Sequence, residues 1–287
     1  MSNPLHSIRL LVNADDFGLH ADINRGISEC VERGRVQSVS FSATGQVVEW
    51  KKLQEWSREG VLIGLHVTLV GEPWTSDGRI LPGWKDLAGR LLFQGRSIRD
   101  DVNREIERQF QLCADNGLDP DTLSHVDSHQ HVHVLNGVWQ PCIDLAREYG
   151  IPRIRVPSCP SWRVIKRSFG GVALQVISRR RAAEREGSLP CLGLAHAGRN
   201  TVATFSHELN CAARAAEITA HRAMELVVHP GVNTPGLEAK YADWRFNWTA
   251  ERDALLSPQF AEAVEAAGYT FSDRTKTSQP NPNSVSD

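Results

Sequence analysis

The sequence predicts an α/β protein built as a single-domain (β/α) barrel, with parallel strands inside and helices outside. Short apolar runs alternate with helical patterns along most of the 287 residues, and this order favours parallel strands joined by helical crossovers. About seven or eight such units in one chain suit a barrel better than an open sheet. Polar residues follow several of the apolar runs, as they do at the active-site face of a barrel.

The strand and helix expectations follow from the spacing of apolar residues along the chain. Runs such as Val61-Leu-Ile-Gly-Leu65 predict buried strands, and Ile98, Val102, Ile106 and Phe110 recur at helical spacing. A helix is expected to stop at Gly150, because Pro152 lies just beyond it. In order, these patterns predict a strand at 8–13, a helix at 21–33, a strand at 36–43, a helix at 47–59, a strand at 61–65, a helix at 97–116, strands at 122–126 and 153–156 around a helix at 138–149, strands at 189–195 and 224–228, a helix at 257–268 and a strand at 269–271.

Two longer connections interrupt this rhythm. Residues 69–96 are rich in Gly, Pro and Trp, and residues 157–187 carry a basic helical stretch. Long insertions of this kind commonly build substrate sites, and Trp74, Trp84 and Trp162 could either stack on a ligand or pack within the loops. We expect the barrel to occupy residues 1–272 and a polar, Pro-containing tail at 273–287 to be disordered.

Composition excludes some classes of partner. The net charge is −2, from 32 basic and 34 acidic residues, which gives no electrostatic footprint for nucleic acid or an anionic membrane. The six cysteines are scattered without a Cys-x-x-Cys pair, as is usual for reduced thiols. No apolar run is long enough for a signal peptide or a membrane span. We therefore expect a cytoplasmic protein, with a homodimer as one assembly to consider.

The most informative motif is His125-Val-Asp127-Ser-His129-Gln-His131-Val-His133, with four histidines and an aspartate in nine residues. Imidazoles and carboxylates are ligands for divalent metals of intermediate softness. Further polar groups follow other expected strands, where a barrel would bring them together. These groups are Asp15-Asp16, His66, Arg155 and His229.

Each of these groups also has an ordinary structural interpretation. Asp15-Asp16 could cap a helix or form a turn, His66 could be a hydrogen-bonded core histidine, and His229-Pro-Gly could end a strand. His125 and His133 could be structural. Taken together, these interpretations require coincidences at five equivalent positions, so the sequence favours a metal-dependent enzyme.

The motifs resemble those of the YdjC-like carbohydrate deacetylase family, in the same order and over roughly residues 8–271. The resemblance implies a distorted (β/α) barrel of the glycoside hydrolase/deacetylase type and removal of the acetyl group from an N-acetylated amino sugar or its oligosaccharide or glycolipid conjugate. It also implies one divalent cation, held by Asp16, His66 and His129. By the same resemblance, Asp15 is the general base and His229 the general acid, and Arg155 holds the catalytic aspartate.

The chemistry suits these roles, because a bound cation lowers the pKa of water and polarises a carbonyl. Asp127 is expected to orient a ligand imidazole, and His131 could serve the same end. The resemblance implies magnesium, whereas two imidazoles and one carboxylate suit zinc or another transition metal. Two alternatives remain: a metal-dependent phosphoesterase or cyclic amidohydrolase on a similar barrel, and a metal-dependent sugar-binding protein without activity.

Overall fold

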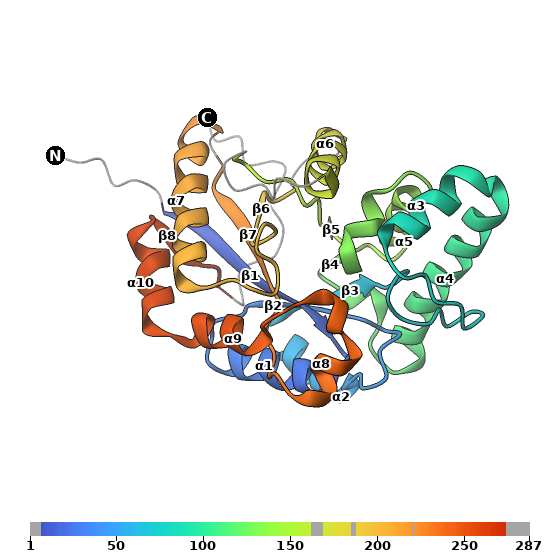
Figure 1. Ribbon diagram of the computed structural model, residues 1–287, viewed down its shortest axis with the longest axis horizontal. Helices are drawn as coiled ribbons and strands as arrows, with labels where there is room; N and C mark the ends of the chain where they lie inside the picture. The colour runs from blue at the N-terminus through green and yellow to red at the C-terminus, as the bar shows by residue number, and fades with distance from the viewer. Residues whose placement is uncertain (1–6, 162–168, 185–187, 220, 274–287) are drawn as a thin grey trace.

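The computed structural model describes residues 7–161, 169–184, 188–219 and 221–273 (Figure 1). Trp162 and nearly all of the expected tail at 273–287 lie outside the described residues. Within the described part of the chain, no helix is both long and apolar enough to cross a membrane.

The core of the fold is a parallel sheet with the strand order β5-β4-β3-β2-β1-β7-β6. β8 pairs with the first residues of β1, whereas β2 pairs farther along that strand. The strands are β1 (Ile8–Phe17), β2 (Ser38–Phe41), β3 (Leu62–Val67), β4 (His125–Ser128), β5 (Arg153–Ile154), β6 (Cys191–Leu192), β7 (Ala223–Val228) and β8 (Tyr269–Phe271).

The sheet forms a half-barrel, which confirms the predicted α/β barrel class. No ladder joins β5 to β6 within the residues that the structure describes. A backbone hydrogen bond from Cys191 N–H to the carbonyl oxygen of Ser158, 2.9 Å long, links the segment after β5 to β6. The two outermost strands are shorter than the expected 153–156 and 189–195, since each has a neighbouring strand on one side alone.

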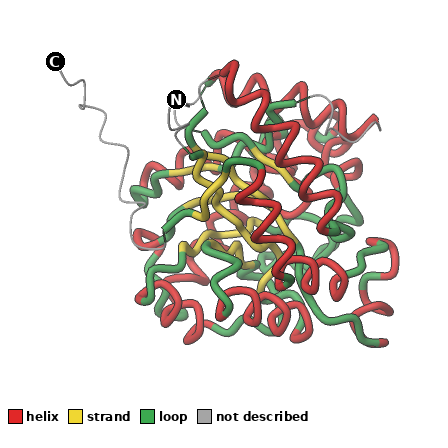
Figure 2. The backbone as a smooth tube through the Cα atoms, turned by 90° about the vertical axis from the view of Figure 1, so that its left-hand side faces the viewer, coloured by secondary structure: helices red, strands yellow, loops and turns green. Residues whose placement is uncertain are grey.

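Helices surround the strands in both views (Figures 1 and 2). The five helices expected at 21–33, 47–59, 97–116, 138–149 and 257–268 are present, and so is a helix in the basic stretch of 157–187. Four further helices were not predicted: α3, α7, α8 and α9. The bounds are α1 (Ala21–Glu32), α2 (Trp50–Arg58), α3 (Trp84–Phe93), α4 (Gly95–Asp115), α5 (Trp139–Glu148), α6 (Phe169–Ala183), α7 (Val202–Thr219), α8 (Pro235–Lys240), α9 (Trp248–Leu256) and α10 (Pro258–Ala266), with short 3₁₀ segments η1 (Pro120–Thr122), η2 (His129–Val134) and η4 (Ala242–Trp244).

Burial on both faces explains why β1 and β3 contain continuous apolar runs rather than alternating patterns. β1 is buried from Leu10 to Phe17, and every residue of β2 is buried. Asn13, Asp15 and Asp16 lie toward the carboxyl end of β1, and His66 lies toward that of β3. This arrangement places the candidate site residues of these two strands at one edge of the sheet.

Candidate metal centre and active site

A bulge at the end of β1 brings two consecutive aspartates to the same region. The pairing of β1 with β2 shifts register between Ala14 and Phe17, and Asp16 has a φ of 76°. Adjacent residues of a regular strand point to opposite faces, whereas a bulge re-aims a side chain. A positive φ is strained for a residue with a Cβ, so this turn is a departure from ideal geometry at the candidate site.

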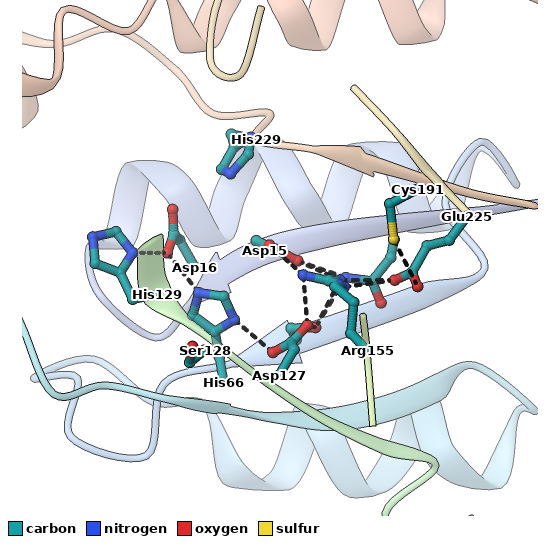
Figure 3. A network of polar contacts seen from close by, with 12 residues as sticks. Asp15, Asp16, His66, Asp127, Ser128, His129, Arg155, Cys191, Glu225 and His229 are labelled. Atoms are coloured by element: carbon teal, nitrogen blue, oxygen red, sulfur yellow. Dashed lines mark hydrogen bonds and ion pairs between the residues drawn. The ribbon is translucent and has the colours of Figure 1, made fainter. Parts of the chain in front are cut away.

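Asp16, His66 and His129 lie together, although they come from β1, β3 and the start of η2 (Figure 3). Asp16 Oδ1 is 3.3 Å from His66 Nε2 and 3.0 Å from His129 Nδ1. Bonds of about 2.0–2.2 Å to one cation would hold neighbouring ligand atoms roughly 3.0–3.5 Å apart. Two of the three pairs of predicted ligand atoms therefore have a spacing compatible with one divalent ion, and all three atoms lie within 4.8 Å of one another.

Two unpartnered atoms support this fit. Asp16 Oδ2 and His129 Nε2 are buried without a hydrogen-bond partner, and such atoms normally have one. The two histidines hold the pKa of Asp16 well below its usual value, against the effect of burial, which raises it. The carboxylate is therefore ionised and available to a cation.

A second group of possible ligands, Asp15, His66 and Asp127, overlaps the first through His66. Its two carboxylates are already bound to Arg155, whose Nη1 lies 2.7 Å from Asp15 Oδ2 and 2.6 Å from Asp127 Oδ2. A metal ion held there would lie next to the buried guanidinium of Arg155, which is also positively charged. The Asp16 group is therefore the better metal site.

Asp127 holds the ring of His66. The two residues are register partners on β3 and β4, and His66 Nδ1 donates to Asp127 Oδ1 over 2.7 Å. Burial alone would lower the pKa of His66, but the carboxylates of Asp127 and Asp15 outweigh it and raise this pKa to about 10. A carboxylate on the far nitrogen is the usual partner of a metal-binding histidine, as the sequence predicted for Asp127.

Arg155 is fully buried and joins three carboxylates. Its Nη1 and Nη2 donate to the two oxygens of Asp15 over 2.7 and 2.9 Å, and its Nε donates to Glu225 over 2.9 Å. Arg153 completes the group by donating to the other oxygen of Glu225 over 2.7 Å. The predicted contact between Arg155 and Asp15 is present, and it fixes the orientation of that carboxylate.

The ionisable groups of this buried region carry more negative than positive charge, and a divalent cation would balance the difference. Four carboxylates, those of Asp15, Asp16, Asp127 and Glu225, are nine-tenths or more buried together with Arg155. Arg153 and Arg155 supply two positive charges, so two negative charges remain when His66 is neutral. Buried charge without a counter-charge is costly, and a doubly charged ion at Asp16 would balance it.

His125 and His133 have structural partners. His125 lies so close over Gly64 that a Cβ there would stand 2.2 Å from its ring; its Nε2 donates to Ser40 Oγ, whose own hydrogen goes to Asp127. His133 Nε2 donates to the Arg155 carbonyl over 2.7 Å, which leaves Nδ1 to accept from Ser128. Burial lowers the pKa of His125 to about 3 and that of His133 to about 4, so both are neutral.

Among the described residues, no hydrogen bond joins His131 to Asp16, His66 or His129, so its predicted supporting role stays a prediction. It and Gln130 both adopt left-handed backbone, with φ values of 55° and 53°, which costs about 1–2 kcal/mol for each residue. Burial, with Arg155 adding to it, lowers the pKa of His131 well below its usual value. Its Nδ1 is buried without a hydrogen-bond partner.

His229 stands at the end of β7, across the β1 carboxylates from His66 (Figure 3). Glycines place this segment: a Cβ on Gly26 of α1 would stand 2.3 Å from Gly231 Cα. The backbone N–H of His229 donates to Glu251 Oε1 over 2.8 Å, and its Nδ1 is 4.0 Å from the same oxygen. Glu251 is the first carboxylate on α9, and burial raises its pKa.

Two aromatic side chains that the sequence analysis missed contact the predicted metal ligand His129 and the predicted general acid His229. Trp244 stacks on His129 with ring centroids 4.6 Å apart, and Phe246 meets the ring of His229 edge-on at 5.2 Å. The signal available was Trp244-Arg-Phe246-Asn-Trp248, an aromatic residue at every second position just after the His229 motif. Glu225 and Glu251 were also missed as partners of Arg155 and His229.

Trp74 and Trp84, which the sequence analysis considered as possible ligand-stacking residues, differ in burial. Trp74 is core, with 2% of its surface exposed and its indole N–H donating to the Leu69 carbonyl over 2.9 Å. Trp84 is half-buried and lines a cavity beside His131. Packing therefore explains Trp74, and Trp84 remains available to a ligand.

Comparison with known proteins identifies similar chains. The family model described as YdjC-like protein matches residues 9–266. A mouse carbohydrate deacetylase is 33% identical over 260 residues, which cover 78% of each chain. A carbohydrate deacetylase of Clostridium beijerinckii is 32% identical over 152 residues, covering 50% of this chain and 59% of that relative. The match thus spans about three fifths of the length of such bacterial relatives.

A solved structure from Enterococcus faecalis V583, provisionally named a cellobiose-phosphate cleavage protein, shares the fold. It superimposes with a TM-score of 0.65 at 21% sequence identity, covering 93% of this chain and 98% of that one. At this identity the likeness supports the fold alone.

Proposed function

Because this chain belongs to the YdjC-like family, we propose that it is a metal-dependent hydrolase that removes the N-acetyl group from an N-acetylated amino sugar. The observation that carries the proposal is the pairing of a three-residue ligand set with an adjacent carboxylate outside that set. Asp16, His66 and His129 fit one cation, and Asp15 next to them is held by Arg155. The relatives named as carbohydrate deacetylases supply the substrate class.

In this proposal the ion, when bound, polarises the acetamide carbonyl and makes bound water more acidic. Asp15 accepts the proton of the attacking water. Arg155 donates to both oxygens of the Asp15 carboxylate and the amide of Asn13 donates to Oδ1, which leaves Oδ2 a second lone pair for the water. The competence of Asp15 as a base therefore rests on its position beside the ligand set.

His229 donates a proton to the departing amine. It lies on the opposite side of Asp15 and Asp16 from His66 (Figure 3), which suits an acid that acts on the leaving group while the base acts on water. The backbone N–H of His229 donates to Glu251, and the ring of Phe246 packs against the imidazole. Both contacts restrict the orientation of His229. The products are acetate and a free amino sugar.

The alternative of a two-metal phosphoesterase or amidohydrolase has less support. The second possible ligand group shares His66 and has its carboxylates on Arg155. The proposal requires one metal ion per chain. A stoichiometry of two metal ions per chain, measured on protein that is reloaded after chelation, would favour the alternative.

The decisive experiment is an acetate-release assay on chelator-stripped protein reloaded with Mg²⁺, Zn²⁺ or Co²⁺. N-acetylglucosamine glycosides and N,N′-diacetylchitobiose serve as substrates, and Asp16→Asn is the matched inactive variant. We expect metal-dependent acetate release from at least one substrate. Metal binding without release of acetate from any of them would count against the proposal and favour the two alternatives. The order of activity among the ions distinguishes magnesium, implied by family resemblance, from zinc, favoured by the two imidazoles.

A further inference from the structure

The two histidines of the predicted ligand set are held in different ways. His66 has the carboxylate of Asp127 on Nδ1, whereas its Nε2 is turned toward Asp16. Among the described residues, the hydrogen bond of His129 is to Asp16, over 3.0 Å, and this carboxylate is itself a predicted ligand. The Nε2 atom of His129 is buried without a hydrogen-bond partner. Metal-binding histidines normally have a partner outside the ligand set, so the orientation of the His129 ring must come from another contact.

Trp244 provides that contact. Its indole stacks on the imidazole of His129, with ring centroids 4.6 Å apart and an angle of 27° between the planes. The torsion that turns a histidine ring about its Cβ–Cγ bond has broad energy minima. A stacked neighbour narrows them, because a turned imidazole would drive its edge into the indole. The Nε2 edge lies beside Gly71, where a Cβ would stand 3.6 Å from that atom. The ring is therefore bounded on its face and on one edge.

A second pair of histidine and tryptophan offers a comparison. His133 is hydrogen-bonded at both ring nitrogens, and its ring centroid lies 6.4 Å from that of Trp139, with 28° between the planes. Hydrogen bonds fix this imidazole, and its stack is loose. The close stack is found on His129, which lacks such bonds. This is the pattern expected if Trp244 replaces a hydrogen-bonding partner.

Trp244 is itself held in place by its neighbours. Its backbone N–H donates to the Tyr241 carbonyl over 3.0 Å, and the two rings lie 4.3 Å apart. The hydroxyl of Tyr241 donates to Glu72 Oε1 over 2.7 Å in buried surroundings, and Glu72 directly follows Gly71 in the chain. The Tyr241–Glu72 hydrogen bond therefore ties together the two segments that bound the ring of His129.

From these contacts we infer that Trp244 is a positioning residue for the metal ligand His129, and that its indole takes the place of the hydrogen-bonding partner that the imidazole lacks. The inference rests on the metal centre of the proposed function. If the ring is free to turn, metal affinity falls in proportion to the fraction of molecules in which a ring nitrogen points at the ion. An aromatic pair biases an orientation by roughly two- to twelvefold.

The test is Co²⁺ affinity, measured by calorimetry on chelator-stripped protein, with Asp16→Asn as the blank for binding elsewhere. We expect Trp244→Ala to weaken binding by about three- to twelvefold. Trp244→Phe keeps a planar ring and should stay within about twofold of the wild type, whereas Trp244→Leu fills space without a plane and should resemble the alanine variant. The control is Trp50→Ala, because Trp50 is also half-buried but packs edge-on against Phe41. It should leave Co²⁺ affinity unchanged.

Denaturant unfolding accompanies each titration, so that affinities are compared among folded proteins. If the alanine variant fails to fold, the difference between Trp244→Phe and Trp244→Leu remains the test, since both retain bulk. A loss below about threefold in folded Trp244→Ala, or equal affinities in the leucine and phenylalanine variants, would overturn the inference. A rise in KM with unchanged Co²⁺ affinity would also overturn it, because Trp244 would then contact the substrate instead of positioning His129.

Metal affinity also separates this inference from the proposed function. Dependence of Co²⁺ affinity on Trp244 in a protein that releases no acetate from any substrate would support the inference, and only the deacetylase proposal would fail. Metal-dependent acetate release with unchanged affinity in the Trp244 variants would do the reverse. Wild-type protein that binds Co²⁺ no better than Asp16→Asn would overturn both.

Discussion

Asp127→Asn tests whether the buried carboxylate network positions a metal ligand. Asp127 Oδ1 accepts from His66 Nδ1 over 2.7 Å, and its other oxygen meets Arg155 Nη1 and Ser40 Oγ. An amide has one oxygen, so whichever way it turns, its NH₂ group must face either the imidazole N–H or the hydroxyl and guanidinium donors. Loss of such a partner typically weakens metal binding 10–100-fold, or about 1.4–2.7 kcal/mol.

The same substitution breaks a buried ion pair, for which we expect about 3–5 kcal/mol of destabilisation. Denaturant unfolding therefore accompanies metal titration by calorimetry, which is done where the variant remains folded. Asp115→Asn is the control, because Asp115 is exposed and its contact with Arg108 is a surface ion pair worth about 0–1 kcal/mol. Wild-type metal affinity in a folded Asp127→Asn protein would refute the argument that Asp127 positions His66.

Three further predictions concern the base, the metal and the acid. Asp15→Asn should retain bound metal and lose at least about a hundredfold in kcat; unchanged turnover would reject Asp15 as the base. Because the pKa of His66 is raised to about 10 without metal, the ion must displace a proton, and affinity should rise about tenfold per pH unit from about 7 to 9; calorimetry in buffers of different ionisation enthalpy should detect about one released proton. The stability that His66 adds to metal-free protein is complete below its unfolded pKa of about 6.5 and declines as pH rises through about 10. His229→Ala should lower kcat about a hundredfold on amides and much less on an O-acetyl ester, whose leaving group needs less protonation; equal losses on both would argue against an acid role.

Local patterns were sufficient to predict the strands that hold the candidate site. The runs before Asp15 and His66 are buried on both faces of the sheet, so their continuous apolar character marked them plainly. The strand before His129 is also buried, but three of its four residues are polar. The proximity of these residues followed from the rule that parallel strands end at one face. Their spacing around a single cation did not, because it depends on the bulge at Asp16 and on the register of β3 with β4.

The missed residues act through contacts between distant segments. Trp244 and Phe246 lie in irregular chain beside α9, and nothing in their local sequence shows that they reach His129 and His229. Glu251 is on a helix that was not predicted, and its carboxylate meets a backbone N–H after β7. Periodicity describes which face of an element is buried. It does not describe which side chain from another element will lie against that face.

Arg155 makes the predicted base and the predicted metal centre parts of one electrostatic unit. Its guanidinium contacts both Asp15 and Asp127, and Asp127 in turn holds the ligand His66. A change in the charge at the metal position therefore alters the field at Asp15 through a buried chain of contacts where water provides little screening. When His66 is neutral, as a metal ligand must be, two negative charges remain in excess in this region, and they favour a divalent ion over a monovalent one. The predicted base and the predicted metal centre therefore both depend on one buried guanidinium, that of Arg155, which directly follows β5.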